Sequence, residues 1–260
     1  MKLVFVRHGE PDYKNDALTE KGREEARLAA ERISGWDVTE FYVSPLGRAK
    51  ETASYTLDKV KREAVELPWI REFSYKVYDR FCGWSGVPWD FVPSDWTECE
   101  DMFRLEDGFL KFPCILENET IQKEYYHVIE EFDRLLASYG YHRDRKFYRN
   151  PAITDMRHIV STTSEENRLF NAPDPDEPVL VFFCHLGVTC LILSHLINIP
   201  FEVLCHGFYL PPTSLTILTT EQRWEDQVYF RVQAMGDCAH LLTADHPISS
   251  AGLFGSAFQG

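Results

Sequence analysis

Two short, uniformly apolar runs near opposite ends of the chain constrain its fold most. They are Leu3–Val6 (LVFV) and Val179–Cys184 (VLVFFC). Apolar runs of this length are typical of strands buried on both faces of a parallel sheet. Each run leads into a predicted helix. The first of these helices opens near Leu18-Thr19, and the second covers about Val188 to Ile197.

Other segments continue this alternation of strands and helices. Glu40–Val43 is predicted to be a strand, and the helix after it is predicted to have Ser44 as its N-cap and Pro45 in its first position. Ser214–Thr219 and Val228–Ala234 are predicted to be the last two strands. We therefore expect an α/β fold, a three-layer sandwich with a mainly parallel central sheet and helices on both faces.

The middle of the chain follows a weaker pattern. Residues from about 73 to 178 contain many aromatic side chains and one clear helical segment near Glu119–Tyr139. We expect them to form cap-like insertions over the C-terminal ends of the strands, within a single domain that covers residues 1–260. The tail from Ala244 is rich in small residues and is expected to be poorly packed.

Composition excludes several classes of protein. A formal net charge of −14 over 260 residues argues against binding to nucleic acid or to an anionic membrane, because both would be repelled. Seven cysteines without a CxxC pair predict reduced thiols and a cytoplasmic location. The N-terminus does not read as a signal peptide, and no apolar run is long enough to span a membrane.

Four basic side chains follow predicted strands. Arg7 and His8 come directly after the first strand, Arg48 lies in the helix start after the second, and His185 follows the strand at Val179–Cys184. The carboxyl ends of strands in an open α/β sheet form a ligand crevice, so these side chains are expected to converge. Two guanidinium groups and two imidazoles make a pocket for an anion such as a phosphate, and they disfavour a metal ion.

The motifs around these residues resemble those of the histidine phosphatase superfamily, the phosphoglycerate-mutase-like proteins. The resemblance rests on the stretches Val6–Pro11 (VRHGEP), Leu18–Ala26 (LTEKGREEA), Ser44–Ala53 (SPLGRAKETA) and Phe183–Val188 (FCHLGV). It covers both sheet-forming ends of the chain well and most of the middle poorly.

The resemblance implies a mechanism. His8 is similar to the family's nucleophile, which takes up the phosphoryl group as a phosphohistidine. Arg7, Arg48 and His185 are similar to the residues that hold the phosphoryl oxygens, and His185 counts among the catalytic residues as well. Glu72 resembles the general acid that protonates the leaving group, a role that needs a raised pKa.

One part of the family pattern differs here. Cys82 and Ser85 replace the usual residues in the motif around Gly83 and Trp84, and extra residues separate this motif from Glu72. Asp79 therefore remains an alternative general acid, and Glu51 is a lesser candidate.

The leading hypothesis is a phosphatase that acts on a small phosphate monoester without a cofactor or metal. A phosphoglycerate-mutase-type phosphoryl transfer is the first alternative. The resemblance counts against it, since true mutases have a longer stretch between RHGE and the next motif. A non-catalytic module that binds a phosphorylated ligand is the second alternative. The expected partner is the phosphorylated substrate, and a homodimer stays open.

Overall fold

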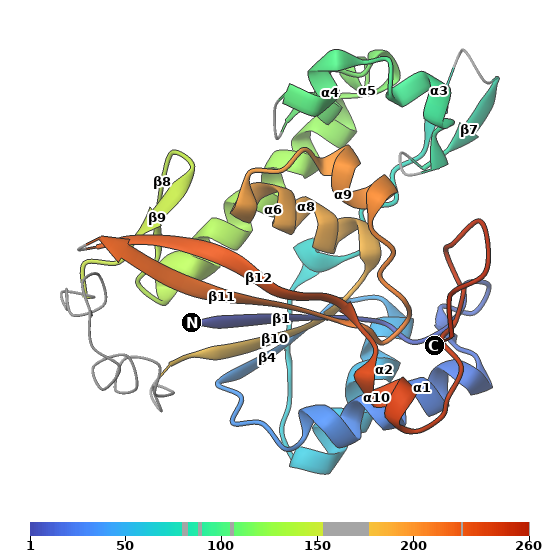
Figure 1. Ribbon diagram of the computed structural model, residues 1–260, viewed down its shortest axis with the longest axis vertical. Coiled ribbons are helices and arrows are strands. Elements are labelled where there is room, and N and C mark those ends of the chain that lie inside the picture. The colour runs from blue at the N-terminus through green and yellow to red at the C-terminus, as the bar shows by residue number, and fades with distance from the viewer. Residues whose placement is uncertain (80–82, 88–89, 105–106, 153–176, 225, 260) are drawn as a thin grey trace.

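The computed structural model describes residues 1–79, 83–87, 90–104, 107–152, 177–224 and 226–259. Its central layer is an eight-stranded sheet in the order β5-β4-β10-β1-β11-β12-β9-β8 (Figure 1). The strands are β1 (Lys2–Arg7), β4 (Glu40–Val43), β5 (Val65–Glu66), β8 (His142–Asp144), β9 (Phe147–Arg149), β10 (Val179–Cys184), β11 (Leu215–Trp224) and β12 (Gln227–Asp237).

The sheet is mixed rather than mainly parallel. Strands β5, β4, β10 and β1 are parallel neighbours, as the alternation of strands and helices predicts. The other half, from β11 to β8, is antiparallel throughout. Hairpins explain the difference, because β11 and β12 are joined by a short turn, and a short turn can only join antiparallel strands. The predicted α/β class is confirmed, and its parallel character holds for one half of the sheet.

Helices cover both faces of the sheet, which gives the three predicted layers (Figure 1). Helices α1 (Glu20–Ile33) and α2 (Gly47–Val60) lie on one face, and α6 (Glu119–Ser138) and α8 (Leu186–Ile197) lie on the other. Alternate residues of β1 pack on opposite faces of the sheet. Val4 and Val6 belong to the apolar cluster that includes residues of α1 and α2. Leu3 and Phe5 belong to the apolar cluster that includes residues of α6 and α8. Successive side chains of a strand point to opposite faces, so this strand is buried on both.

The two helices after β1 and β4 begin differently. The Thr19 side chain accepts a hydrogen bond from the Gly22 backbone at the start of α1, where the sequence predicts a helix to open. Helix α2 begins only at Gly47, with Leu46 in the N-cap position and no side-chain cap. The prediction that Ser44 caps this helix is therefore wrong, because Ser44 lies two residues before the N-cap position; its hydroxyl accepts from the Leu46 backbone N–H over 3.3 Å.

The segment between Phe73 and α6 forms a cap of short elements above one end of the sheet (Figure 1). The short elements of this region are β6 (Val77–Asp79), β7 (Trp84–Gly86), α3 (Pro93–Trp96), α4 (Glu100–Arg104), η3 (Gly108–Lys111) and α5 (Pro113–Leu116), with η1 (Pro68–Ile70) before them and α9 (Phe201–Gly207) packed against them. Buried cap residues such as Phe73 and Phe109 belong to the same apolar cluster as Phe5 and Phe182. The cap and the upper face of the sheet therefore share one apolar core.

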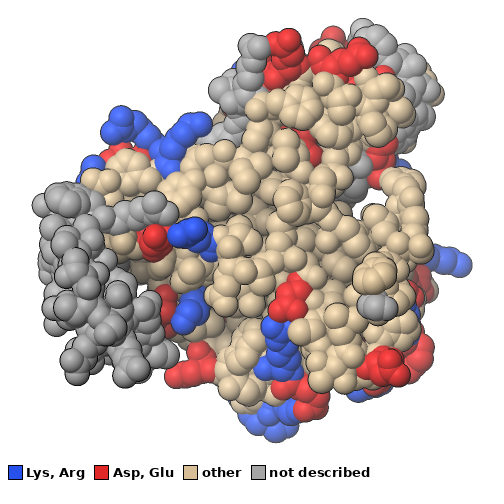
Figure 2. Space-filling view, in the orientation of Figure 1, with Lys and Arg blue, Asp and Glu red and all other residues tan. Residues whose placement is uncertain are grey.

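The surface of the cap is acidic at its outer end (Figure 2). Glu98, Glu100 and Asp101 are exposed there. Residues 80–82, 88–89 and 153–176, which belong to the predicted insertions, lie outside the described residues. Within the described ranges, no helix combines the length and the apolar character needed to cross a bilayer.

The remaining elements are the small hairpin of β2 (Pro11–Asp12) and β3 (Ala17–Leu18) and the short helix α10 (Ala239–Thr243). The prediction of a poorly packed tail holds for residues such as Gly252–Ser256, which are exposed, but not for Ser249. Ser249 is fully buried, and its hydroxyl donates to Glu10 Oε2 over 2.6 Å. The tail after α10 returns to the end of the sheet where β1 finishes (Figure 1).

Candidate active site

Neighbouring strand ends bring the predicted basic residues together. Arg7 at the end of β1 is in register with Cys184 at the end of β10, so His8 and His185 follow side by side. Their ring centroids are 5.1 Å apart. Strand β4 ends beside β10, where the Ser44 backbone donates to Phe183 O over 3.0 Å. We call Arg7, His8, Arg48 and His185 the strand-end group.

The His8 ring is held in one tautomer. Its Nδ1 lies 2.7 Å from Gly9 O, and a carbonyl oxygen only accepts, so Nδ1 carries the proton. The unprotonated nitrogen of the neutral ring is then Nε2. Burial, reinforced by the charge of Arg7, lowers the pKa of His8 well below its usual value. A neutral imidazole with a free Nε2 lone pair is the form that can attack phosphorus.

His185 has a different environment. Its Nε2 lies 2.7 Å from Ser44 Oγ. Burial and the nearby His8 lower the pKa of His185 well below its usual value. Its Nδ1 is buried and has no hydrogen-bond partner among the described residues. That nitrogen is available to a ligand oxygen.

Both arginines are anchored by groups outside the predicted set. Arg7 donates from Nη2 to Ala251 O over 3.0 Å and also to Leu210 O. Arg48 donates to Asp16 Oδ1 over 2.6 Å. The Nε atoms of both arginines are buried without a partner in the described part of the chain. Two positive groups with an unpaired donor each, beside the His185 Nδ1, make a site that favours an anion such as a phosphoryl group.

Glu72 lies at the N-terminus of α8, next to the strand-end group. Its Oε1 accepts hydrogen bonds from the backbone of Gly187 over 2.9 Å and of Val188 over 3.3 Å. Burial raises the pKa of Glu72, although Arg7, Arg48 and the backbone hydrogen bonds lower it. A carboxyl group that keeps its proton at higher pH can act as a general acid.

A cavity of about 640 Å³ opens over these residues. Arg7, Arg48 and Glu72 line it, with His8 and His185 almost fully buried beside them. Its remaining lining residues come from the β2–β3 hairpin, the starts of α2 and α8, the cap and the C-terminal tail: Tyr13, Leu46, Arg71, Ser74, Val87, Asp90, Leu186, Gly252, Leu253 and Phe254. We call the cap and tail members of this lining, namely Ser74, Val87, Asp90, Gly252, Leu253 and Phe254, the outer wall.

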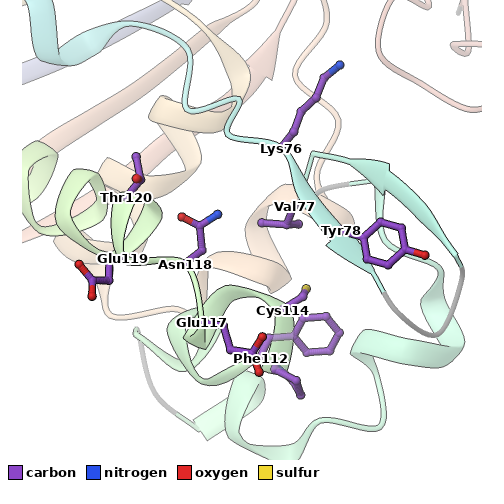
Figure 3. A pocket seen from close by; sticks show the side chains of 10 residues that line it. Lys76, Val77, Tyr78, Phe112, Cys114, Glu117, Asn118, Glu119 and Thr120 are labelled. Carbon is purple, nitrogen blue, oxygen red and sulfur yellow. The ribbon is translucent and has the colours of Figure 1, made fainter.

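A second cavity of about 540 Å³ lies within the cap (Figure 3). Lys76, Tyr78, Glu117 and Asn118 are among its lining residues, and they come from the segment around β6 and the segment around α5. Among the described residues, no arginine or histidine lines this cavity, and the strand-end group does not reach it. The anion chemistry therefore belongs to the first cavity.

Thr213 is hydrogen-bonded to the backbone of two residues of the strand-end group, Arg7 and His8. Its backbone N–H is shared between Arg7 O at 3.0 Å and His8 O at 3.2 Å. Its φ is +58°, a conformation that costs a β-branched residue energy. The hydroxyl lies 3.1 Å from His240 Nε2. A strained residue that bonds both of these carbonyls fixes the position of the Arg7-His8 backbone.

The N-terminal third of the chain is similar to a known family. Residues 3–85 match the sequence model of the histidine phosphatase superfamily (branch 1). The match contains Arg7, His8, Arg48 and Glu72, and it ends before most of the cap.

Curated relatives match only part of the chain. The 2,3-bisphosphoglycerate-dependent phosphoglycerate mutase of Thermoplasma acidophilum is 37% identical over 76 residues, which is 25% of this chain and 38% of that protein. A probable phosphoglycerate mutase of Photorhabdus laumondii is 30% identical over 89 residues, which is 31% of this chain and 41% of that protein. The chain thus spans about two fifths of the length of these relatives.

Two solved phosphatase structures share the fold over nearly the whole chain. A mutant phosphoserine phosphatase of Entamoeba histolytica, in complex with phosphoserine, has a TM-score of 0.55 at 17% identity and covers 92% of this chain and 98% of its own. A mycobacterial glucosyl-3-phosphoglycerate phosphatase with inorganic phosphate has a TM-score of 0.55 at 19% identity, with the same coverage of 92% and 98%. At such identities the likeness concerns the fold.

Sequence reasoning found the strand-end group and Glu72 but missed the groups that hold them. Asp16 and Thr213 lack a motif that would reveal their contacts. The tail residues Gly252–Phe254 give only one weak signal, a glycine that tolerates a φ of +86°. Of the alternative acids, Glu51 is bound to the Leu18 backbone and to Arg23 and does not line the cavity. Asp79 belongs to β6, and its side chain lies outside the described part of the structure.

Proposed function

We propose that this protein is a phosphatase that hydrolyses a small-molecule phosphate monoester through a phosphohistidine on His8. The observation that carries the proposal is the 2.7 Å contact between His8 Nδ1 and Gly9 O. It leaves the Nε2 lone pair free beside two buried arginines. Arg7, Arg48 and His185 would hold the phosphoryl oxygens and neutralise their charge, which is most of what phosphoryl transfer requires.

The reaction has two steps. In the first, His8 Nε2 attacks phosphorus and the bond from phosphorus to the ester oxygen breaks, while Glu72 gives its proton to the leaving alcohol. In the second, water attacks the phosphohistidine and returns a proton to the Glu72 carboxylate. The P–N bond breaks, inorganic phosphate leaves and neutral His8 is restored. Neither step requires a metal ion, because the guanidinium groups supply the positive charge.

A mutase remains the second candidate because the curated relatives of this chain are named phosphoglycerate mutases. A mutase returns the phosphoryl group from His8 to a second oxygen of a sugar-acid phosphate, whereas a phosphatase gives it to water. The two candidates share the pocket and His8, so they differ only in the acceptor.

The test is phosphate release from a panel of phosphate monoesters in the presence of excess chelator. We expect turnover with at least one ester and no dependence on added metal. Interconversion of phosphoglycerates that requires a bisphosphorylated primer, with no phosphate release, would favour the mutase. Complete loss of activity in chelator, restored by a divalent metal, would overturn the proposed mechanism.

Replacement of His8 tests the covalent step. We expect His8→Ala to lose at least roughly 10³-fold in kcat and to trap no acid-labile, base-stable phosphate on the protein. His127→Ala is the matched control, because His127 is an exposed histidine on α6 that does not line the cavity. A His8→Ala protein that retains activity within about tenfold of the original would contradict the nucleophile assignment.

A further inference from the structure

The C-terminal tail is fixed against the active site by three contacts. Ser249 donates to Glu10 Oε2 over 2.6 Å, and its carbonyl accepts from the Tyr209 hydroxyl over 2.7 Å. Ala251 O accepts from Arg7 Nη2 over 3.0 Å. Two of these partners, Glu10 and Arg7, belong to the RHGE segment itself. The tail therefore has a defined position relative to the phosphoryl site.

Gly252 allows the tail to approach Arg7 this closely. A Cβ atom at this position would lie 2.9 Å from Arg7 Nη2. Its φ of +86° is also a conformation that side chains rarely adopt. The backbone here is thus packed directly on a phosphoryl-binding guanidinium group, and the direction of the next residues is set by that contact.

The next two residues line the mouth of the cavity. Leu253 and Phe254 both belong to its lining, and Phe254 is 89% exposed. Phe254 contacts no other aromatic ring in the described part of the chain. A large apolar ring exposed at the mouth of a cationic cavity gains free energy when an apolar group covers it.

Tyr13 contributes a second ring to the same cavity. It is 65% exposed and lies with the Arg48 guanidinium over its ring, 5.4 Å from the centroid. Leu46 and Leu186 add apolar surface to the lining. The cavity thus has the buried cations Arg7 and Arg48, and its exposed lining combines apolar side chains from separate segments with Arg71 and Ser74.

We propose that Leu253 and Phe254 form a subsite for the organic part of the substrate, so that the enzyme prefers phosphate monoesters that carry a flat apolar group. The inference rests on the proposed phosphatase function and specifies its substrate class. The phosphoryl group is held by the strand-end group, and the aryl group stacks on Phe254 at the mouth. Aromatic rings prefer offset or edge-to-face contacts, and such contacts add to the area they bury.

The test compares Phe254→Ala with Phe258→Ala. Phe258 is 85% exposed on the same tail and does not line the cavity, so it is a matched control. We measure kcat/KM for 1-naphthyl phosphate relative to methyl phosphate. We expect this ratio to fall roughly five- to tenfold in Phe254→Ala, through a higher KM for the naphthyl ester, and to stay within about twofold in Phe258→Ala.

A binding measurement separates this inference from the proposed function. Calorimetry with 1-naphthylphosphonate and methylphosphonate, which cannot be hydrolysed at the P–C bond, gives the same ratio for dissociation constants without catalysis. A wild-type protein that releases no phosphate would refute the phosphatase proposal while the binding ratio still decides the subsite. An unchanged ratio in Phe254→Ala, or an equal fall in both variants, would overturn the subsite.

Discussion

The strand-end group and the outer wall meet at the same cavity, but they are built in opposite ways. Arg7, His8, Arg48 and His185 are all buried and are anchored by strand ends and backbone carbonyls. The outer wall consists of loop residues from the cap and the tail, and Phe254 is almost fully exposed. One side of the cavity is rigid and charged, and the other is more apolar and accessible.

On the proposed function, the difference separates chemistry from specificity. The family match contains three members of the strand-end group and ends at residue 85, so most of the cap and the whole tail lie beyond it. A phosphoryl group is the same in every phosphate monoester, which explains a shared, buried set of cations. The organic part varies between substrates, and loops can change around it without disturbing a buried sheet end. Substitutions on the two sides should therefore have different signatures.

The largest effect is expected at Glu72, which belongs to the chemical side. If Glu72 protonates the leaving group, Glu72→Gln should lower kcat/KM for an alkyl phosphate by roughly 10²–10⁴-fold. An aryl ester with a good leaving group, such as nitrophenyl phosphate, should lose much less, because nitrophenolate leaves without a proton. Parallel kinetics with the two esters measure this difference. Equal losses on both, with a leaving-group-dependent loss in Asp79→Asn, would transfer the role to Asp79.

The pH profile sharpens the same assignment. The free enzyme requires neutral His8, whose pKa lies well below its usual value, and protonated Glu72, whose pKa is raised by burial. The kcat/KM should therefore fall at low pH as His8 gains a proton, and fall again as pH rises through the Glu72 pKa. Glu72→Gln should remove the alkaline limb and leave the acid limb. An alkaline limb that persists in Glu72→Gln would assign it to another group.

An intermediate effect on kcat/KM is expected at Gly252, where the outer wall contacts the strand-end group at Arg7. Gly252→Ala forces a Cβ to within 2.9 Å of Arg7 Nη2 and strains a positive φ, so the tail or Arg7 must shift. We expect a loss of roughly tenfold in kcat/KM for all substrates, because small displacements of a positioning group are costly. Gly255→Ala is the control, since a Cβ there meets nothing within 4 Å. Equal activity of the two variants would show that the tail does not position Arg7.

The smallest effect is expected at Thr213, behind the strand-end group. Thr213→Gly and Thr213→Ala both lose the contact of the hydroxyl with His240, but only alanine keeps a Cβ at a φ of +58°. The glycine variant should therefore be more stable than the alanine variant by about 1 kcal/mol. Urea unfolding of the two variants measures the difference. Equal or reversed stabilities would mean that the backbone relaxes and stores no strain here.

Three of the four parallel strands, β1, β4 and β10, were predicted from the sequence with accurate bounds, and the two-residue strand β5 was not. Glu40–Val43 and Val179–Cys184 are strands at those residues, because a strand buried on both faces must be uniformly apolar. Of the antiparallel half, β11 and β12 were predicted as strands and the short strands β8 and β9 were not, since two three-residue strands are too short to show a pattern. Ser44 was predicted as an N-cap because serine favours that position, but α2 begins three residues later, at Gly47.

The candidate site was also predicted only in part from the sequence. The residues of the strand-end group and Glu72 were named from motifs, and the structure brings all five together. The residues that hold these side chains in place were not named from motifs. Asp16, Thr213 and Ala251 act through contacts that no spacing pattern encodes. Thr213 and Ala251 act through backbone atoms, which every residue type has.

The sequence by itself determined which residues carry charge and protons and on which strands they lie. Local patterns suffice for this, because the period of apolar residues sets strand and helix, and the motif follows each strand directly. Only the tertiary structure decided that the tail from Ser249 to Phe254 returns to Arg7. Its small and exposed residues have no pattern that reports a contact with the opposite end of the chain, and the fit depends on the distance between Gly252 and one guanidinium nitrogen.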